Sequence, residues 1–270
     1  MSLVDTDWLE KNLDNVKIID CSWHMPAENR NAQDEFDKEH IPNAIFFDLD
    51  KNSKQNTDLP HMLPSLEVWN EIISDLGISN DDQIVIYDNS NVISSCRGWY
   101  NFIYFGHDPK LVSVLDGGFK KWKSENKKTS NISANLNKSN YKGNELSKLV
   151  KNKVLIDQNI SKKEFMVVDA RSRERFEGKA PDPRKNVRSG SIPNSVCLPF
   201  VEVINENKTF KNKEDLNKLF KEISKNFEEN LVFSCGSGVT ACVLALAYSL
   251  LNTKYLPTIY DGSWSEYGKI

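Results

Sequence analysis

The chain lacks the features that would place it in a membrane or on a nucleic acid. No apolar run approaches the roughly 20 residues that a helix needs to cross a bilayer, and the amino terminus lacks the basic-then-apolar order of a signal peptide. With 35 basic and 38 acidic side chains, the formal net charge is -3, which is too balanced to attract a polyanion. We therefore expect a cytoplasmic protein with no nucleic-acid partner and no membrane partner.

Cysteine is also scarce, and its spacing argues against two kinds of site. The five cysteines are an odd number, lie far apart and include no C-x-x-C pair that would suggest a zinc site or a redox dithiol. We expect reduced thiols, no metal and no organic cofactor. The cysteines are Cys21, Cys96, Cys197, Cys235 and Cys242.

One of these cysteines stands in a segment typical of a catalytic nucleophile. The apolar run 231–234 predicts a buried strand, and the good helix formers of 241–251 predict a helix. Cys235 would lie between the two, where Gly236 and Gly238 allow successive backbone N–H groups to turn inward. Those N–H groups and the positive end of the helix dipole would stabilise a thiolate.

The two halves of the chain repeat the same order of motifs. The matching ranges, first half then second, are 16–20 and 165–169, 41–44 and 192–195, 66–76 and 214–227, 83–87 and 231–234, and 115–122 and 260–267. Short buried strands that alternate with helices predict a parallel sheet covered on both faces. We expect an α/β protein with two tandem domains, 1–125 and 149–270, joined by a polar surface linker at 126–148.

The repeat is asymmetric at the position of the nucleophile. Where the second half has Cys235, the first half has Asp88 at the end of the matching strand. A carboxylate cannot act as a soft sulfur nucleophile, so we expect only the carboxy-terminal half to be catalytic. The amino-terminal half would be structural or would supply a wall of the site.

Together these features resemble the two-domain rhodanese family, and within it the 3-mercaptopyruvate sulfurtransferases. The resemblance is carried by the tandem repeat, the loop 235–241 and the ending 260–264, and it covers nearly the whole chain. It implies two rhodanese-like domains and a cysteine that takes sulfur from a donor, holds it as a persulfide and passes it on. The acceptor would be a protein dithiol such as thioredoxin, a small thiol or cyanide. The loop residues expected at the substrate are Gly236, Gly238, Val239, Thr240 and Ala241.

The neutral loop favours 3-mercaptopyruvate as the donor, with release of pyruvate. Family members that use thiosulfate usually have basic residues directly after the cysteine, where they would pair with the dianion, whereas this chain has Gly236 and Ser237. Mercaptopyruvate has its carboxylate at the far end of a short ketoacid. The resemblance implies that Arg175 and Arg184 bind this carboxylate and the ketone through forked hydrogen bonds.

The resemblance also implies a set of residues for proton transfer. In the family, the serine two residues after the cysteine is linked to a histidine and an aspartate of the amino-terminal domain. The matching residues here are Ser237, His61 and Asp50. A carboxylate that orients an imidazole, which in turn polarises a hydroxyl, follows the logic of hydrolase triads.

Three alternative functions fit the sequence less well. A thiosulfate sulfurtransferase would need cations near Cys235 from elsewhere in the fold. A cysteine phosphatase would need an arginine six residues after the nucleophile, where this chain has Ala241. A rhodanese-like binding module with an inert cysteine would not need the intact loop or the two arginines.

Overall fold

The protein folds into two compact units. A computed structural model describes residues 2–223, 230–252 and 254–270. The first unit consists of Met1–Gln55, Leu63–Leu146 and Glu206–Thr209, and the second of Asn56–Met62, Ser147–Asn205 and Phe210–Ile270. In sequence, the segment 56–62 lies between two stretches of the first unit, but it packs with the second unit. The domain limits expected from the sequence stay a prediction.

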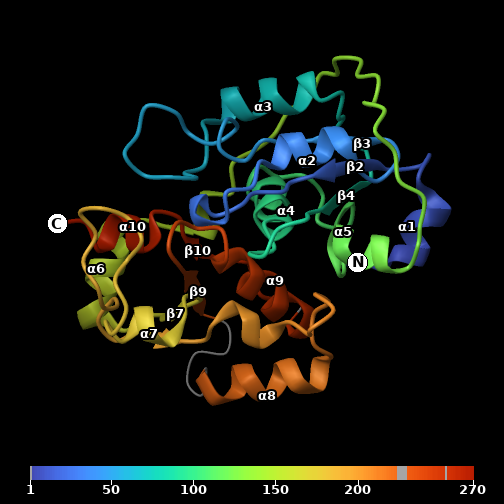
Figure 1. Cartoon of the computed structure of the whole chain (residues 1–270). Helices are drawn as coiled ribbons and strands as arrows, with labels where there is room; N and C mark the ends of the chain where they lie inside the picture. Colours follow the sequence, from blue (N-terminus) through green and yellow to red (C-terminus); the bar gives the residue numbers. More distant parts are fainter. Residues whose placement is uncertain (1, 224–229, 253) are drawn as a thin grey trace. The chain divides into compact units, whose positions relative to one another are not determined.

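The first unit is built on a parallel five-stranded sheet in the order β1-β5-β4-β2-β3 (Figure 1). The strands are β1 (Leu3–Val4), β2 (Lys17–Asp20), β3 (Ala44–Phe46), β4 (Ile84–Tyr87) and β5 (Val112–Leu115). The helices are α1 (Thr6–Asn12), α2 (Ala32–Lys38), α3 (Leu66–Asp75), α4 (Ser95–Tyr104), α5 (Gly118–Ser124) and the short 3₁₀ helix η1 (Pro26–Glu28).

Both faces of this sheet are covered, as the alternation of side chains along a strand requires. One face packs against α1, α2 and α5 through a cluster that includes Leu9, Phe36 and Trp122. On the other side, the ring of Trp69 from α3 packs against Phe102 of α4. The expected arrangement of a parallel sheet between helices is confirmed.

The second unit repeats this topology in the order β6-β10-β9-β7-β8, again parallel (Figure 1). The strands are β6 (Val150–Lys151), β7 (Met166–Asp169), β8 (Val196–Cys197), β9 (Leu231–Ser234) and β10 (Ile259–Tyr260). The helices are α6 (Lys153–Lys162), α7 (Arg173–Phe176), α8 (Lys213–Ile223), α9 (Ala241–Leu251), α10 (Ser263–Tyr267) and the 3₁₀ helices η2 (Ser147–Leu149) and η3 (Phe200–Val203).

In the second unit, α6 and α10 lie on one face of the sheet, and α8 and α9 lie on the other (Figure 1). The helix α9 coincides with the range that the sequence predicted, because almost every one of its residues is apolar and buried. The helix α8 is amphipathic and buries Leu216 and Phe220, one turn apart. The expected continuation of that helix over 224–227 lies outside the described residues.

The segment expected to be a surface linker, 126–148, runs over the first unit and is attached to it at several points. Gly143 N–H donates to Asn70 Oδ1 at 2.7 Å. Tyr141 is 2 % exposed, and its ring stacks on His107 with ring centres 5.8 Å apart. An aromatic anchor and backbone hydrogen bonds therefore hold a segment whose composition is otherwise polar.

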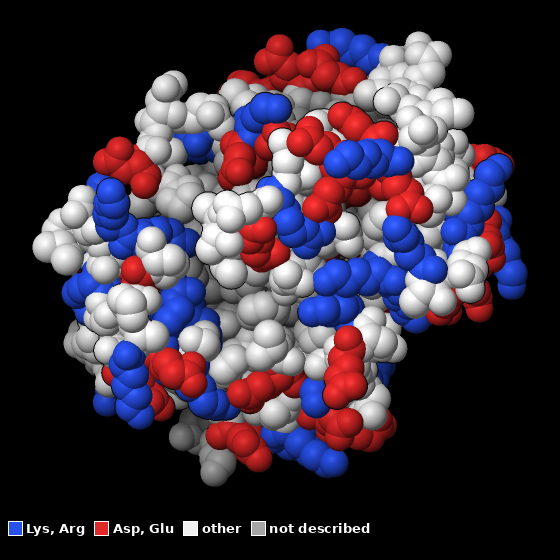
Figure 2. Space-filling view, in the orientation of Figure 1, with Lys and Arg blue, Asp and Glu red and all other residues white. Residues whose placement is uncertain are grey.

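Basic and acidic side chains are interspersed over the face seen in Figure 2, in keeping with the net charge of -3. Among the described residues, no helix is both long and apolar enough to cross a bilayer.

A buried ion pair and a tryptophan pack together at the end of β7. Arg171 donates two hydrogen bonds from Nε to Asp169, at 3.1 and 3.0 Å, and one from Nη2 at 2.7 Å. The side chains of both residues are 2 % exposed. Trp264 is sandwiched, because the guanidinium carbons of Arg171 and Arg188 lie 4.4 and 4.6 Å from its ring centre. Arg171 and Arg188 thus hold Trp264 in place.

Replacing Arg171 with alanine is expected to destabilise the second unit by about 3–5 kcal/mol, because Asp169 would remain as a buried, unpaired charge. Arg173→Ala is the matched control, since Arg173 pairs with Glu202 while its own side chain is 52 % exposed. The control should cost less than about 1 kcal/mol. Urea unfolding of both variants measures the difference, and equal losses would contradict the structural role of the buried pair.

Candidate active site

The expected nucleophile lies in a short loop between a strand and a helix. β9 ends at Ser234, Cys235 follows with 2 % of its surface exposed, and α9 begins at Ala241. Gly238 adopts φ +78°, in the left-handed region where a side chain is strained. The carbonyls of Val239 and Thr240 accept hydrogen bonds from the N–H groups of the first helical turn, at 3.1 and 3.2 Å. The loop thus passes directly into the helix, as the sequence predicted.

The first residues of α10 hold the backbone of this loop through hydrogen bonds. The carbonyl of Cys235 accepts a hydrogen bond from Trp264 N–H at 3.0 Å, and that of Gly236 accepts one from Ser265 N–H at 2.9 Å. Cys235 N–H donates to the buried hydroxyl of Ser263 at 3.2 Å. The peptide planes around the cysteine are therefore set by the protein before any ligand binds.

In the first unit, the position that matches Cys235 carries a carboxylate. Asp88 follows β4 as Cys235 follows β9, and its carbonyl accepts from Phe119 N–H at 2.9 Å. Its carboxylate accepts hydrogen bonds from the N–H groups of Ser90 at 2.8 Å and Ser95 at 3.0 Å. A strand, a turn and a helix start in this arrangement hold a negative charge.

Two arginines lie directly against the loop. A Cβ placed on Gly236 would lie 3.1 Å from Nη2 of Arg184 and 3.6 Å from Nη2 of Arg175. A side chain at this position would be in tight contact with the guanidinium group of Arg184 and in ordinary contact with that of Arg175. The structure therefore brings together Cys235 and the two arginines expected to bind substrate.

A residue that the sequence reasoning missed holds both arginines. The carboxylate of Asp182 accepts from Arg175 Nη2 at 2.6 Å, from Arg184 Nη1 at 3.2 Å and from the Arg184 N–H at 3.0 Å. Its side chain is 1 % exposed. Burial opposes ionisation, but these hydrogen bonds and the two positive charges prevail and lower the pKa of Asp182. The only signal in the sequence was that Asp182 lies between two prolines, in the segment Pro181-Asp182-Pro183-Arg184.

The hydroxyl of Ser237 lies next to an imidazole. His61 Nδ1 is 3.0 Å from Ser237 Oγ, and both residues are 5 % exposed. His61 belongs to the segment 56–62 that packs with the second unit, and its φ of +60° is uncommon for a residue with a side chain. The chain thus adopts a strained conformation where it presents this ring.

Replacing His61 with asparagine is expected to lower kcat about 100-fold, within the range for the loss of a group that transfers protons. Asparagine tolerates the left-handed backbone that His61 adopts, so the fold should be kept. Steady-state kinetics and a thermal melt of the same preparation test this. An unchanged kcat with an unchanged melting temperature would remove His61 from the mechanism.

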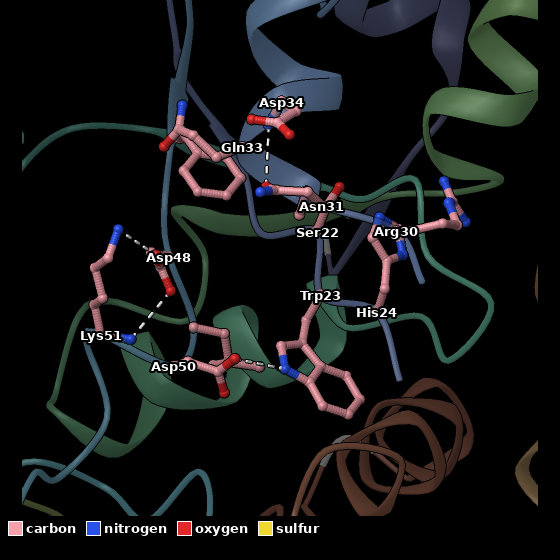
Figure 3. Close-up of a pocket in the computed structure, with 13 residues that line it drawn as sticks. Ser22, Trp23, His24, Arg30, Asn31, Gln33, Asp34, Asp48, Asp50 and Lys51 are labelled. Carbon is pink, nitrogen blue, oxygen red and sulfur yellow. Dashed lines mark hydrogen bonds and ion pairs between the residues drawn. The ribbon is translucent and has the colours of Figure 1, made fainter. Parts of the chain in front are cut away.

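Asp50, the third residue expected in proton transfer, lies in the first unit. Its carboxylate accepts a hydrogen bond from Trp23 Nε1 at 3.0 Å, and the two side chains face each other in Figure 3. They line a pocket of 410 Å³ together with residues of the β2 and β3 ends. A role of Asp50 beside His61 stays a prediction.

Comparison with known proteins places this site in a family. The rhodanese-like domain model matches residues 5–125 and 153–269. Thiosulfate/3-mercaptopyruvate sulfurtransferase 1 of Arabidopsis thaliana, a mitochondrial protein, is 39% identical over 98% of this chain and 75% of its own length. 3-Mercaptopyruvate sulfurtransferase of Mus musculus is 36% identical over 98% of this chain and 91% of its own. The crystal structure of SseA from Escherichia coli, a 3-mercaptopyruvate sulfurtransferase, has a TM-score of 0.86 and 29% identity, covering 98% of this chain and 99% of that one.

The chain therefore belongs to the rhodanese family, with two tandem rhodanese-like domains. Its relatives over nearly its whole length are sulfurtransferases, and the chain is an enzyme of this class.

Proposed function

We propose that this enzyme transfers sulfur from 3-mercaptopyruvate through a persulfide on Cys235 and releases pyruvate. The observation that carries the proposal is the pair Arg175 and Arg184, which Asp182 holds against the loop of the cysteine. Two guanidinium groups in fixed positions suit the carboxylate and ketone oxygens of a short ketoacid. The two curated relatives reported above carry mercaptopyruvate in their names, which supports this donor.

In the first half-reaction, the Cys235 thiolate attacks the sulfur of mercaptopyruvate. An S–S bond forms, the carbon–sulfur bond breaks, and its electron pair leaves as the enolate of pyruvate. The enolate takes the proton that the donor thiol carried, so that pyruvate leaves and an anionic persulfide remains. The loop amides and the dipole of α9 would stabilise that anion, as the matching loop holds the carboxylate of Asp88.

Ser237 and His61 are proposed to carry the proton between these groups. Their contact of 3.0 Å lets the imidazole polarise the hydroxyl, and the hydroxyl lies two residues from the nucleophile. The fixed geometry avoids the cost of orienting the pair during the reaction.

In the second half-reaction, a thiol is proposed to take the outer sulfur and restore the Cys235 thiolate. The acceptor would be thioredoxin, a small thiol or, in the assay, cyanide. We propose the cytoplasm as the compartment, supported by free thiols at all five cysteines. Subcellular fractionation tests the compartment.

Thiosulfate is the second candidate donor, and one observation favours it. The arginines lie against Gly236, one residue from Cys235, so the loop has cations nearby although its own residues are neutral. The Arabidopsis thaliana relative carries both donors in its name.

Steady-state sulfur transfer to cyanide with the two donors side by side tests the proposal. Cys235→Ser serves as the blank. We expect kcat/KM to be at least about 10-fold larger for mercaptopyruvate, because only this donor spans both arginines. A larger kcat/KM for thiosulfate would overturn the assignment of the donor.

A further inference from the structure

A pocket of the catalytic unit is lined in part by Arg184, one of the two arginines proposed to bind the donor. Its volume is 490 Å³, within the usual range for small-ligand sites. The lining residues are Asp58, Pro60, Arg184, Lys185, Asn186, Val187, Ser265 and Lys269. We call this the Lys185–Lys269 pocket.

The pocket adjoins the cysteine loop through two of its lining residues. Arg184 lies against Gly236, where a Cβ would meet its guanidinium group at 3.1 Å. Ser265 N–H donates to the carbonyl of Gly236 at 2.9 Å. A small molecule in the pocket would therefore lie beside the residue that follows Cys235.

The pocket lining includes a short antiparallel bridge and the turn beside it, and each contributes one lysine. Val187 bridges with Lys269, and Ile270 N–H donates to the carbonyl of Asn186 at 3.0 Å. Asn186 has a φ of +61°, so Lys185 lies in the turn directly before the bridge and not in a strand. Both lysines line the pocket, one from the bridge and one from this turn.

The pocket lining has a net positive charge, because its three basic residues outnumber its one acidic residue. The basic residues are Arg184, Lys185 and Lys269, and the acidic residue is Asp58. Asp58 pairs with Lys269 at 3.0 Å, but the two side chains are 86 % and 51 % exposed. Such an exposed pair contributes little, so an incoming anion can compete for Lys269 at small cost.

We propose that the Lys185–Lys269 pocket is the acceptor subsite and that it selects small thiols that carry a carboxylate. This rests on the proposed persulfide chemistry of Cys235. The acceptor thiolate attacks the outer sulfur of the persulfide, the S–S bond to Cys235 breaks, and its electron pair returns to Cys235 as thiolate. The carboxylate of the acceptor lies on Lys185 and Lys269 while its sulfur reaches toward the loop.

The experiment isolates the acceptor step. Cys235 is loaded with sulfur from inorganic polysulfide and desalted, so that the result does not depend on mercaptopyruvate being the donor. The loaded enzyme is then mixed with 3-mercaptopropionate, 2-mercaptoethanol or cysteamine, which carry negative, neutral and positive groups. Rate constants are compared at equal thiolate concentration.

We expect the anionic thiol to react about 10-fold faster than the neutral one at low salt, with the difference shrinking as salt screens the lysines. The double variant Lys185→Glu/Lys269→Glu should lose this preference. Lys218→Glu, on α8 and 76 % exposed, is the matched control and should keep it.

Equal rates for the three thiols would overturn the proposal, as would a preference that survives the double variant. A double variant that changes kcat/KM for the donor with cyanide as acceptor, while the thiol preference stays, would assign the pocket to the donor instead. Failure of the proposed donor reaction is seen separately, when mercaptopyruvate does not load Cys235 but polysulfide does.

Discussion

Cys235→Ala is expected to lose at least about 1000-fold in kcat, because the variant lacks the atom that we propose receives the sulfur. The variant should also fail to gain the mass of one sulfur atom after exposure to donor, as measured on the intact protein. Cys235 is buried in a loop that Trp264 and Ser265 hold through its carbonyls, so the fold should survive the change. A circular dichroism melt checks this.

Cys197→Ala is the matched control for that prediction. Cys197 is partly exposed at the end of β8 in the same unit, but burial, with the charge of Asp169, raises the pKa of its thiol to about 11. It is therefore a protonated thiol at neutral pH and a poor nucleophile. The control should keep full activity, and loss of activity in it with retention in Cys235→Ala would reverse our assignment of the nucleophile.

Arg175→Met is expected to raise KM for mercaptopyruvate about 100-fold, with a smaller change in kcat. A hydrogen bond from a charged donor is worth about 1.5–3 kcal/mol, and every 1.4 kcal/mol is a factor of ten. Methionine keeps much of the length of the arginine stem, so packing changes little. Initial rates over a range of donor concentrations separate the two constants.

The same helix provides the control for this variant. Arg173 is two residues away on α7 and pairs with the carboxylate of Glu202 at 2.7 Å. Arg173→Met should change KM less than about two-fold, since exposed ion pairs contribute little. Similar effects of the two variants would show that α7 acts through its overall charge and not through a specific clamp.

The pH dependence of donor binding by Arg175 and Arg184 follows from Asp182, which holds both side chains. Its pKa is lowered below the ordinary value of 3.8, so its carboxylate is charged throughout the neutral and mildly acidic range. The stability that it contributes is present above the ordinary pKa and is lost only as the pH falls through the lower folded value. KM for the donor should therefore not change through titration of this group above about pH 4.

The repeated fold could be predicted from the sequence because its elements are locally consistent. The helix α9 consists of good helix formers and is buried from Ala241 to Tyr248, so pattern and structure agree to the residue. The attachment of 126–148 to the first unit could not be predicted, because its buried aromatic residue, Tyr141, stands in a polar stretch and its other contacts are hydrogen bonds of the backbone. The packing of 56–62 with the second unit depends on contacts between distant segments, which periodicity does not encode.

The parts of the site that consist of adjacent residues could be predicted from the sequence, but the parts that depend on burial could not. The loop from Cys235 to Ala241 carried its own signal. Arg171 and Asp182 did not, because arginine and aspartate are ordinarily surface residues and only the structure shows their side chains almost fully buried. The proximity of His61 to Ser237 joins positions 176 residues apart, and only a family resemblance could suggest it.

The carboxylate of Asp88 stabilises the loop of the first repeat in a way that the loop of Cys235 in the second repeat lacks. In the first repeat, the carboxylate oxygens of Asp88 accept hydrogen bonds from the N–H groups of Ser90 and Ser95. In the second, the equivalent residue is a cysteine, whose sulfur is a weaker acceptor, so the resting enzyme gives up stabilisation that the first repeat keeps. The persulfide would supply the missing negative charge. Loading with sulfur should therefore act as a stabilising ligand for the catalytic repeat, and each turnover would pass through a more stable and a less stable form of the same domain.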